Sequence, residues 1–306
     1  MEVSIIVPVY NKETFIEKCL RSALSVDFDS FEVIAVDDES TDQSAAICER
    51  LASEDSRLRV FHIPNGGVTG ARLYGLQQAR GRFVMFVDSD DELLPNALSA
   101  TYPVIIREEA DEVFATYVDQ HGRKYSSNHI GTVADTTILI KEICCRTAHF
   151  SFAWGILYRK EILEGCLDQA MGRSYAEDKL MQLKVLMKHP KVWFISDTIY
   201  LYNADIPNSW RSFTIAKDLE FEEALRRTLS PEWDRLESAF NMHRIKMYER
   251  YLENRDFESC RYYQDLRRLK DPSLSLPSRI VISLPQRISW ILVWVYRKYR
   301  RLTHKG

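Results

Sequence analysis

The sequence predicts an α/β fold in which a mainly parallel sheet carries helices on both faces, followed by an all-helical extension. Short, almost wholly apolar runs alternate with helical patterns over roughly the first 90 residues, which is the spacing of parallel strands joined by helical crossovers. Strand and helix patterns are mixed over residues 96–215. From about Ala216 to Lys270 the chain is dense in charge and poor in glycine, which predicts helices throughout.

The first half of the sheet is predicted from four apolar runs, as expected of strands covered on both faces. These strands are residues 3–10, 31–36, 58–64 and 82–87. The helices between them are residues 13–25, 40–52 and 68–79. Ser40 and Gln43 are expected to form a capping box at the start of the second helix.

Beyond Pro95 the same reading predicts a hairpin, three helices and a long strand. The hairpin comprises residues 112–119 and 124–128 and turns at His121-Gly122. The predicted helices are 135–145, one entered from residues 152–163, and 175–189, and the strand is 191–202.

The bulk composition indicates a globular protein with a sizeable core. Apolar residues make up 45% of the 306 positions and charged residues 28%. A net charge of −3 argues against general nucleic-acid binding. The six cysteines form no CxxC pair, and the first residues lack the features of a signal peptide. We therefore expect a reduced, cytoplasmic location.

Each of the first four strands ends in polar residues. The strand ends are Tyr10-Asn11, Asp37-Asp38, Asn65-Gly66-Gly67 and the acidic turn Asp88–Glu92. Because the carboxyl ends of parallel strands share one edge of the sheet, these residues are expected to meet where α/β proteins bind ligands.

The chemistry of this edge favours a nucleotide held with a metal ion. A calcium-binding EF loop starting at Asp88 would need glycine at Leu93 and glutamate at Ser99. The Gly66–Gly70 segment does not match the dinucleotide motif and follows the third strand, not the first. An Asp-x-Asp turn such as Asp88–Asp90 suits Mg²⁺ or Mn²⁺ shared with phosphate oxygens.

Five segments of the chain resemble family 2 glycosyltransferases of the GT-A fold, especially bacterial enzymes that build capsule, exopolysaccharide or lipopolysaccharide. They are VSIIVPVYN, FEVIAVDDESTDQS, NGGVTGARLYGLQQARGRFVMFVDSDDELLP, FAWGILYRKEIL and YAEDKLMQL. The resemblance implies a metal-dependent enzyme, of the hexosyl- or N-acetylhexosaminyltransferase class, that inverts the anomeric centre of a sugar taken from a nucleoside diphosphate, usually UDP. It implies a lipid-linked or glycan acceptor.

The resemblance also assigns roles to individual residues. Pro8, Val9 and Tyr10 would border the base, Asp38 would bind it, and Glu13 and Asn65 would lie at the nucleotide rim. Asp88 and Ser89 would lie on the nucleotide as well, with Asp88 at the ribose. Asp90 would ligate Mn²⁺ or Mg²⁺ beside the diphosphate. Asp178 would be the general base that takes the proton of the acceptor hydroxyl.

Other candidates stay open. Glu177 is an alternative base, and Asp37 and Asp91 belong to the two aspartate clusters. Arg72 either stabilises the carboxylates or pairs on the surface, and Trp154 either floors the sugar pocket or is a buried aromatic. The chain departs from the family pattern at Ala176, usually glycine, at Ile156, often lysine, and at Asn203, often arginine, for which Arg211 is the substitute. A non-catalytic partner subunit that keeps the fold is therefore the alternative function.

The last residues form a separate prediction. Residues 279–306 hold seven Lys/Arg and no acid, and Ile288–Tyr296 is almost wholly apolar with Trp290 and Trp294 one turn apart. The run is too short to span a bilayer, which needs about 20 residues. We expect a helix lying on an anionic membrane surface, against the alternatives of a packed final helix or a homodimer contact. The predicted domains are thus 1–215 (nucleotide half 1–95, acceptor half 96–215), 216–276 and the tail 277–306.

Overall fold

The structure, a computed structural model, describes residues 1–145, 148, 150–167, 176–206, 214–269 and 274–303, with the backbone alone over 297–303. The chain divides into two compact units. One is formed by residues 1–136 and 149–212 and contains the sheet; the other is formed by residues 137–148 and 213–306 and is helical. Each unit is described by itself. The predicted boundaries at residues 95, 215 and 276 stay predictions.

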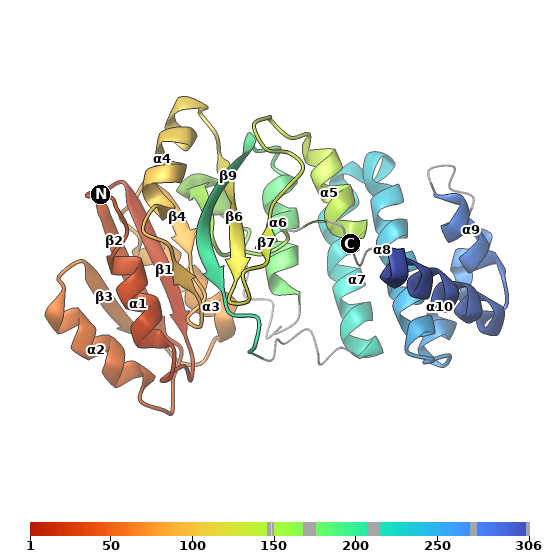
Figure 1. Ribbon diagram of the computed structural model, residues 1–306, viewed down its shortest axis with the longest axis horizontal. Helices are drawn as coiled ribbons and strands as arrows, with labels where there is room; N and C mark the ends of the chain where they lie inside the picture. The colour runs from red at the N-terminus through yellow and green to blue at the C-terminus, as the bar shows by residue number, and fades with distance from the viewer. Residues whose placement is uncertain (146–147, 149, 168–175, 207–213, 270–273, 304–306) are drawn as a thin grey trace. The chain divides into compact units, whose positions relative to one another are not determined.

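The sheet unit is built on one mixed sheet whose first part is parallel (Figure 1). Its strands are β1 (Val3–Val9), β2 (Phe31–Asp37), β3 (Leu58–His62), β4 (Phe83–Phe86), β5 (Glu92–Leu93), β6 (Glu112–Asp119), β7 (Lys124–Tyr125), β8 (Ile156–Arg159) and β9 (Val192–Tyr202). Their order is β3-β2-β1-β4-β8-β6-β9-β5, with β7 paired to β6. Strands β1 to β4 are parallel, so their carboxyl ends share one edge. Strand β8 runs antiparallel to both β4 and β6.

Helices cover both faces of the parallel strands. The helices of this unit are α1 (Ile16–Leu24), α2 (Ser44–Glu54), α3 (Gly67–Gln78), α4 (Ala97–Arg107) and α6 (Glu177–Leu186), with the short 3-10 helix η1 (Lys160–Leu163). Side chains alternate between the two faces of a strand. Ile5 and Val7 of β1 belong to the core that includes residues of α1 and α2, whereas Ile6 faces α3.

Helix α3 lies unusually close to the sheet. A Cβ atom placed on Gly75 would overlap Cγ2 of Ile6 and stand 3.3 Å from Cγ2 of Val36. Real side chains do not approach this closely, so only glycine lets the helix settle here. Arg72 precedes Gly75 by three positions and therefore shares its inward face. This contact explains how an arginine becomes almost completely buried, with 2% of its surface exposed.

Most of the predicted elements are confirmed, and two are wrong. The strand runs, the 112–125 hairpin and the helix over 177–186 are present. The capping box is wrong: α2 begins at Ser44 after Gln43, with no side-chain cap, because the Ser40 hydroxyl accepts a hydrogen bond from the backbone N–H of Asn11. Residues 156–159 form β8 where a helix approach was expected, since their apolar side chains fill a buried position between β4 and β6.

The helical unit has its own core. Its elements are α5 (Thr136–Cys145), α7 (Ile215–Leu229), η3 (Ser230–Glu232), α8 (Trp233–Glu253), η4 (Ser259–Arg268), α9 (Leu276–Ser283) and α10 (Gln286–Thr303). Buried side chains of α8, η4 and α9, together with Val293 of α10, form one cluster, against which Trp290 of α10 packs. The predicted helical extension is therefore present. Over the described residues, we find no helix that is both long and apolar enough to cross a membrane.

Candidate active site

The loops after β1 and β2 are joined by hydrogen bonds at the carboxyl edge of the sheet. Asn11 adopts a left-handed backbone, with φ of 51°, and its side-chain oxygen accepts from the N–H of Thr41 at 2.8 Å. The N–H of Lys12 donates to the Ser44 hydroxyl at 2.7 Å. The N–H of Glu13 donates to the Asp42 carboxylate at 3.1 Å. Asp42 and Ser44 therefore fix the loop that precedes α1.

The predicted nucleotide residues lie along this edge with different exposures. Tyr10 exposes 47% of its surface and is open to a stacking partner, whereas Pro8 and Val9 are buried within β1. Asp38 is buried and accepts a hydrogen bond from the backbone N–H of Gly66 at 2.7 Å. Asn65 is exposed and its N–H donates to Glu39 at 3.2 Å.

Two further candidates make structural contacts at this edge. Asp37 is buried and lies 3.2 Å from Nδ1 of His62, which is its neighbour on β3. The hydrogen bonds of His62 with Glu49 and Asp37 raise the pKa of that imidazole. Glu13 is exposed, and its carboxylate accepts from the N–H of Gln43 at 3.0 Å. Both side chains thereby tie neighbouring strand ends together.

At the centre of the site, Arg72 of α3 bridges two carboxylates. Its guanidinium donates to Asp88 at 2.7 Å and forms a second ion pair with Asp178. Asp88 follows β4, and Asp178 stands in the first turn of α6. The structure thus brings a predicted nucleotide ligand and the predicted base to the same cation. Burial disfavours the charged form of Arg72, but the charges of Asp178 and Asp88 outweigh it and raise the pKa, so the guanidinium stays charged.

The carboxylates around Arg72 have perturbed acidities. Burial, opposed by Arg72, raises the pKa of Asp88 to about 6. Burial and the neighbouring charge of Asp178 raise the pKa of Glu177 to about 7. A carboxyl group with a pKa near neutrality is suited to proton transfer. Glu177 is therefore a stronger candidate for acid–base work than the sequence alone indicates.

The acidic turn continues with Asp91, which points into the protein. It is 2% exposed and accepts hydrogen bonds from the Tyr200 hydroxyl at 2.8 Å and the N–H of Asn203 at 2.7 Å. Burial and the charge of Asp88 raise its pKa to about 8. Tyr200 also accepts from the N–H of Asp88 at 3.1 Å. Tyr200 therefore fixes the turn, although its sequence context is only that of a strand residue. Ser89 is buried beside it.

Asp90 is the member of the turn that faces outward. Its carboxylate lies 2.5 Å from Nζ of Lys12, and the two side chains are 19% and 27% exposed. Asp90 also lines a cavity of about 360 Å³. Lys12 was not predicted as a site residue. The sequence could have indicated it, because it is a lysine directly after Asn11 at an otherwise acidic edge of the sheet.

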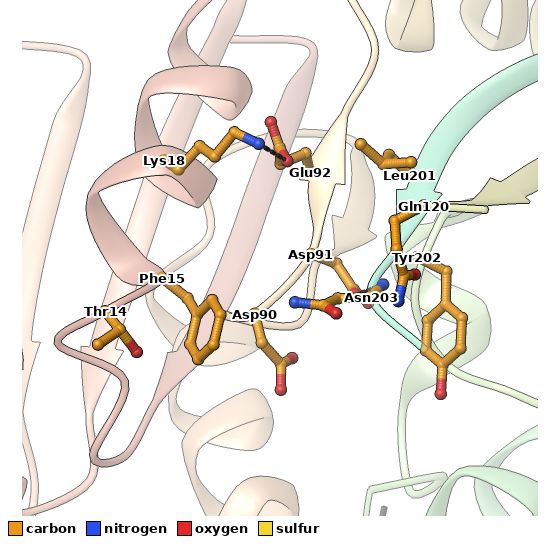
Figure 2. A pocket seen from close by; sticks show the side chains of 10 residues that line it. All are labelled: Thr14, Phe15, Lys18, Asp90, Asp91, Glu92, Gln120, Leu201, Tyr202 and Asn203. Atoms are coloured by element: carbon orange, nitrogen blue, oxygen red, sulfur yellow. Dashed lines mark hydrogen bonds and ion pairs between the residues drawn. The ribbon is translucent and has the colours of Figure 1, made fainter. Parts of the chain in front are cut away.

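Figure 2 shows this cavity between α1, the acidic turn and the end of β9. Phe15 and Asp90 face it from one side and Tyr202 and Asn203 from the other. Its lining residues are Thr14, Phe15, Lys18, Asp90, Asp91, Glu92, Gln120, Leu201, Tyr202 and Asn203. A space of this size holds a small polar group beside Asp90.

Trp154 belongs to an aromatic cluster beneath the turn. Its ring stacks on Phe152 at 3.9 Å and on Tyr200 at 4.5 Å between centroids, and it meets Tyr117 edge-on at 5.0 Å. Only 7% of Trp154 is exposed. The geometry is that of a buried aromatic supporting Tyr200, which is the second of the two expectations for this residue.

The acidic turn suits a metal ion shared with phosphates. In the part of the chain that the structure describes, no group of three or more His, Cys, Asp and Glu side chains is placed to hold a metal by itself. Asp90, however, offers a partly exposed carboxylate at a cavity, and hard divalent ions take one or two carboxylates plus substrate oxygens. The residues present therefore fit a metal bound together with a diphosphate. Arg211, the proposed substitute for an arginine, lies outside the described residues.

Comparison with known proteins finds glycosyltransferases among those similar to this chain. The uncharacterized glycosyltransferase EpsJ of Bacillus subtilis is 32% identical over 217 residues, which cover 68% of this chain and 62% of EpsJ. The crystal structure of Staphylococcus aureus TarS 1-349 in complex with UDP-GlcNAc superposes with a TM-score of 0.73 at 22% identity, covering 98% of this chain and 92% of that one. The mannosyltransferase PcManGT from Pyrobaculum calidifontis, in complex with GDP-Man and Mn²⁺, gives 0.53 at 17% identity, covering 96% and 86%.

These likenesses show the GT-A fold followed by a helical region, as the sequence predicts. The aligned part spans less than two thirds of EpsJ. The model of the family named Glycosyl transferase family 2 matches residues 4–167, more than half of the 306 residues. The chain therefore belongs to glycosyl transferase family 2.

Proposed function

We propose that this protein transfers a sugar from UDP-sugar to a hydroxyl of a lipid-linked or glycan acceptor, with inversion, in the synthesis of a bacterial cell-surface polysaccharide. The observation that carries the proposal is the Arg72 bridge between Asp88 and Asp178. It joins the carboxylate turn, which suits a metal ion with a diphosphate, to Asp178, the carboxylate proposed as the base. A nucleotide site alone would not need the second group.

The donor would lie along the joined loops. Tyr10 is open for stacking on the base, and Asp38 lies at the end of β2 beside it. The fold shared with a UDP-GlcNAc complex supports a uridine nucleotide. The identity of the sugar stays open between hexose and N-acetylhexosamine.

Asp90 would hold Mn²⁺ or Mg²⁺ with the diphosphate oxygens, a role supported by the Mn²⁺ complex of a protein with the same fold. A bound divalent ion stabilises the negative charge that develops on the leaving diphosphate. Asp90→Asn is expected to reduce transfer by roughly 100-fold or more, the scale for losing charge stabilisation in a transition state, while thermal unfolding changes little.

Asp178 would act as the general base. The acceptor oxygen forms a bond to the anomeric carbon from the face opposite UDP, its proton passes to the carboxylate, and the bond from that carbon to the diphosphate oxygen breaks. The electron pair of that bond leaves with UDP, so the step is balanced without a further reactant. Arg72 would hold Asp178 in place through its ion pair.

The test is a thermal-shift screen of UDP, GDP and their sugars with Mn²⁺, followed by assays of donor hydrolysis. A bound donor stabilises the folded protein by mass action. Stabilisation by UDP with Mn²⁺, together with hydrolysis of one UDP-sugar, supports the transferase. Binding without any turnover, in the presence of acceptors from a bacterial lipid extract, favours the non-catalytic partner. No stabilisation by any nucleotide contradicts the transferase and also favours the partner subunit.

The outer face of α10 supports attachment to the inner face of the cell membrane as a peripheral protein. Ile288, Ile291, Leu292 and Val295 form a stripe along one side of the helix, and each exposes between 39% and 50% of its surface. On the other side Ser289 and Val293 are buried. Trp290, expected at a membrane, packs instead on the helical core with Arg255 4.6 Å from its ring centroid, while Trp294 is 50% exposed.

The positive charge of the C-terminal segment indicates which kind of surface the apolar stripe would contact. Residues 279–306 contain seven Lys/Arg and no acid. An apolar stripe on a basic segment suits an anionic lipid surface, to which each basic residue contributes on the order of 1 kcal/mol. Lipid-linked acceptors reside on that surface, so attachment would bring the enzyme to its substrate.

A further inference from the structure

Lys12 forms an ion pair with Asp90, the carboxylate proposed to bind a metal ion. Nζ of Lys12 lies 2.5 Å from Oδ2 of Asp90, and the residues are 78 positions apart in the sequence. Lys12 comes from the loop after β1 and Asp90 from the turn after β4, neighbouring strands of the sheet. The ion pair therefore spans the place where the proposed diphosphate would lie.

The loop that carries Lys12 is held in place. The N–H of Lys12 donates to Ser44 at 2.7 Å, and Asn11 before it is bonded on both its N–H and its side chain to Ser40 and Thr41. A fixed backbone restricts where the side chain can reach. The loop therefore keeps Lys12 within reach of Asp90.

The other acids of the turn have partners of their own. Asp88 pairs with Arg72, and Asp91 accepts from Tyr200 and Asn203. Glu92 pairs with Lys18 at 2.7 Å. Within the ion pairs of the described residues, Lys12 is the cation assigned to Asp90. Its removal would alter this carboxylate and leave the other pairs in place.

We propose that Lys12 is the resting counter-ion of Asp90, which a divalent cation must displace, and that the displaced ammonium then binds the donor diphosphate. The inference rests on the proposed function. Two cations cannot share one carboxylate at contact distance without strong repulsion. The diphosphate offers the ammonium a new anionic partner within the same loop, so nucleotide binding would free Asp90 for the metal.

The consequence is a thermodynamic coupling between metal and nucleotide. In the wild type, Mn²⁺ alone competes with Lys12, whereas Mn²⁺ with UDP does not. Each ligand therefore raises the affinity for the other by the same factor. Without Lys12 the metal would bind more readily alone, UDP would lose one cationic contact, and the coupling factor would shrink.

The experiment measures Mn²⁺ binding to the full chain, by electron paramagnetic resonance of the free ion, with and without UDP. Lys12→Met is compared with the wild type and with Lys246→Met. The control loses the same charge from a lysine pair of similar burial outside the site, since Lys246 lies 2.8 Å from Glu249 and the two side chains are 31% and 19% exposed. We expect Lys12→Met to bind Mn²⁺ alone about three- to tenfold more tightly, the range for losing a competing partly buried cation, and Lys246→Met to stay within about twofold.

The two arms separate the inference from the proposed function. Unchanged or weaker Mn²⁺ binding by Lys12→Met without UDP overturns the role of Lys12, as does a coupling factor equal to that of the wild type. Absence of Mn²⁺ binding in every variant, with or without UDP, overturns it too and removes Asp90 as a metal ligand. Failure of UDP to bind the wild type contradicts the proposed function, while the nucleotide-free comparison still decides the role of Lys12.

Discussion

Arg72 and Asp178 are ion-paired although 106 positions separate them in the sequence. The same guanidinium holds Asp88, so helix α3, the end of β4 and the start of α6 converge on one buried cation. Without it, two partly exposed carboxylates would face each other with no cation between them. The pair therefore serves the stability of the sheet unit as well as the arrangement of the proposed active site.

Replacing Arg72 with methionine is expected to destabilise the protein by about 2–3 kcal/mol, less than the roughly 3–5 kcal/mol for a fully buried pair, because the side chains of Asp88 and Asp178 are 28% and 21% exposed and stay partly hydrated. The loss of stability should be smaller at pH 5 than at pH 8. Without Arg72 the carboxylates of Asp88 and Asp178 repel each other, and this repulsion is relieved when one of them takes up a proton. Urea unfolding at the two pH values measures it. The control is Arg57→Met, whose residue pairs with Asp55 at the surface and should cost less than about 1 kcal/mol. Equal losses for the two variants would contradict the central role of Arg72.

Asp178→Asn and Glu177→Gln distinguish the two candidate bases. If Asp178 is the base, Asp178→Asn lowers kcat by orders of magnitude with little change in UDP affinity, since the base acts on the acceptor. The pKa of Glu177 is raised to about 7, so a base at that position would make kcat/KM rise with pH through about 7. Measuring kcat/KM against pH for the wild type and both variants decides which residue is the base. An inactive Glu177→Gln with an active Asp178→Asn would reverse the assignment.

The buried carboxyl group of Glu112 is expected to make the free energy of unfolding decrease as the pH rises. It is fully buried on β6, and burial raises its pKa to about 8 although the Gln182 amide donates to it at 2.7 Å. Between the unfolded pKa, near 4.5, and the folded pKa, the folded state retains a proton that the unfolded state releases. The free energy of unfolding therefore falls as the pH rises through this window, by up to roughly 1.4 kcal/mol per unit.

Glu112→Gln should flatten that dependence and be more stable than the wild type at pH 8.5. Urea unfolding between pH 5 and 8.5 measures it. Glu32→Gln is the matched control on β2: burial opposes its ionisation, but Arg59, the N–H of Arg80 and the Ser4 hydroxyl together lower its pKa. That carboxylate contributes stability above the unfolded pKa, which is lost as the pH falls. Glu32→Gln should therefore be destabilised at pH 8, and a stabilised variant would contradict the assignment.

Ala176 is a site where glycine should stabilise the protein. It precedes α6 with φ of 57° and ψ of 25°, the left-handed region in which a Cβ atom is unfavourable by about 1 kcal/mol or slightly more. Ala176→Gly is expected to raise the free energy of unfolding by roughly 0.5–1 kcal/mol, after the extra entropy of the unfolded chain is subtracted. Thermal unfolding tests it against Ala100→Gly in α4, a helical position where glycine should destabilise.

Substitutions on the outer stripe of α10 test the membrane proposal. Removing everything after Leu276 would also remove the buried side chains of Val281, Ile282 and Val293, so point changes are cleaner. Ile291→Ser with Val295→Ser should abolish flotation with vesicles rich in anionic lipid and leave UDP binding intact. Val133→Ser, at an exposed apolar position of the sheet unit, is the control. Wild-type protein that fails to float, or a double variant that floats normally, would contradict the proposal.

The sequence predicted the architecture of the first strands because their apolar runs and polar ends are local signals. The sequence also predicted that the turn with Asp88 and Asp90 lies at the same edge of the sheet as the ends of the other parallel strands, since strand direction alone decides that. It did not predict which side chains pair with these residues. The burial of Arg72 depends on the contact between Gly75 and Ile6, and the hydroxyl of Tyr200 reaches Asp91 from 109 positions away. Such contacts arise from packing between elements, which no local pattern encodes.

The hydrogen bonds between the loops after β1 and β2 have a dynamic consequence. Asn11 and Glu13 are exposed and Lys12 is partly exposed, yet the backbone N–H of each donates to a side chain in the segment from Ser40 to Ser44. In return, the amides of Thr41 and Gln43 donate to side chains of the first loop. Neither loop can open while the other stays closed without breaking the whole set. The entrance to the proposed nucleotide site should therefore exchange its amide hydrogens as one cooperative unit, more slowly than the exposure of its residues would suggest.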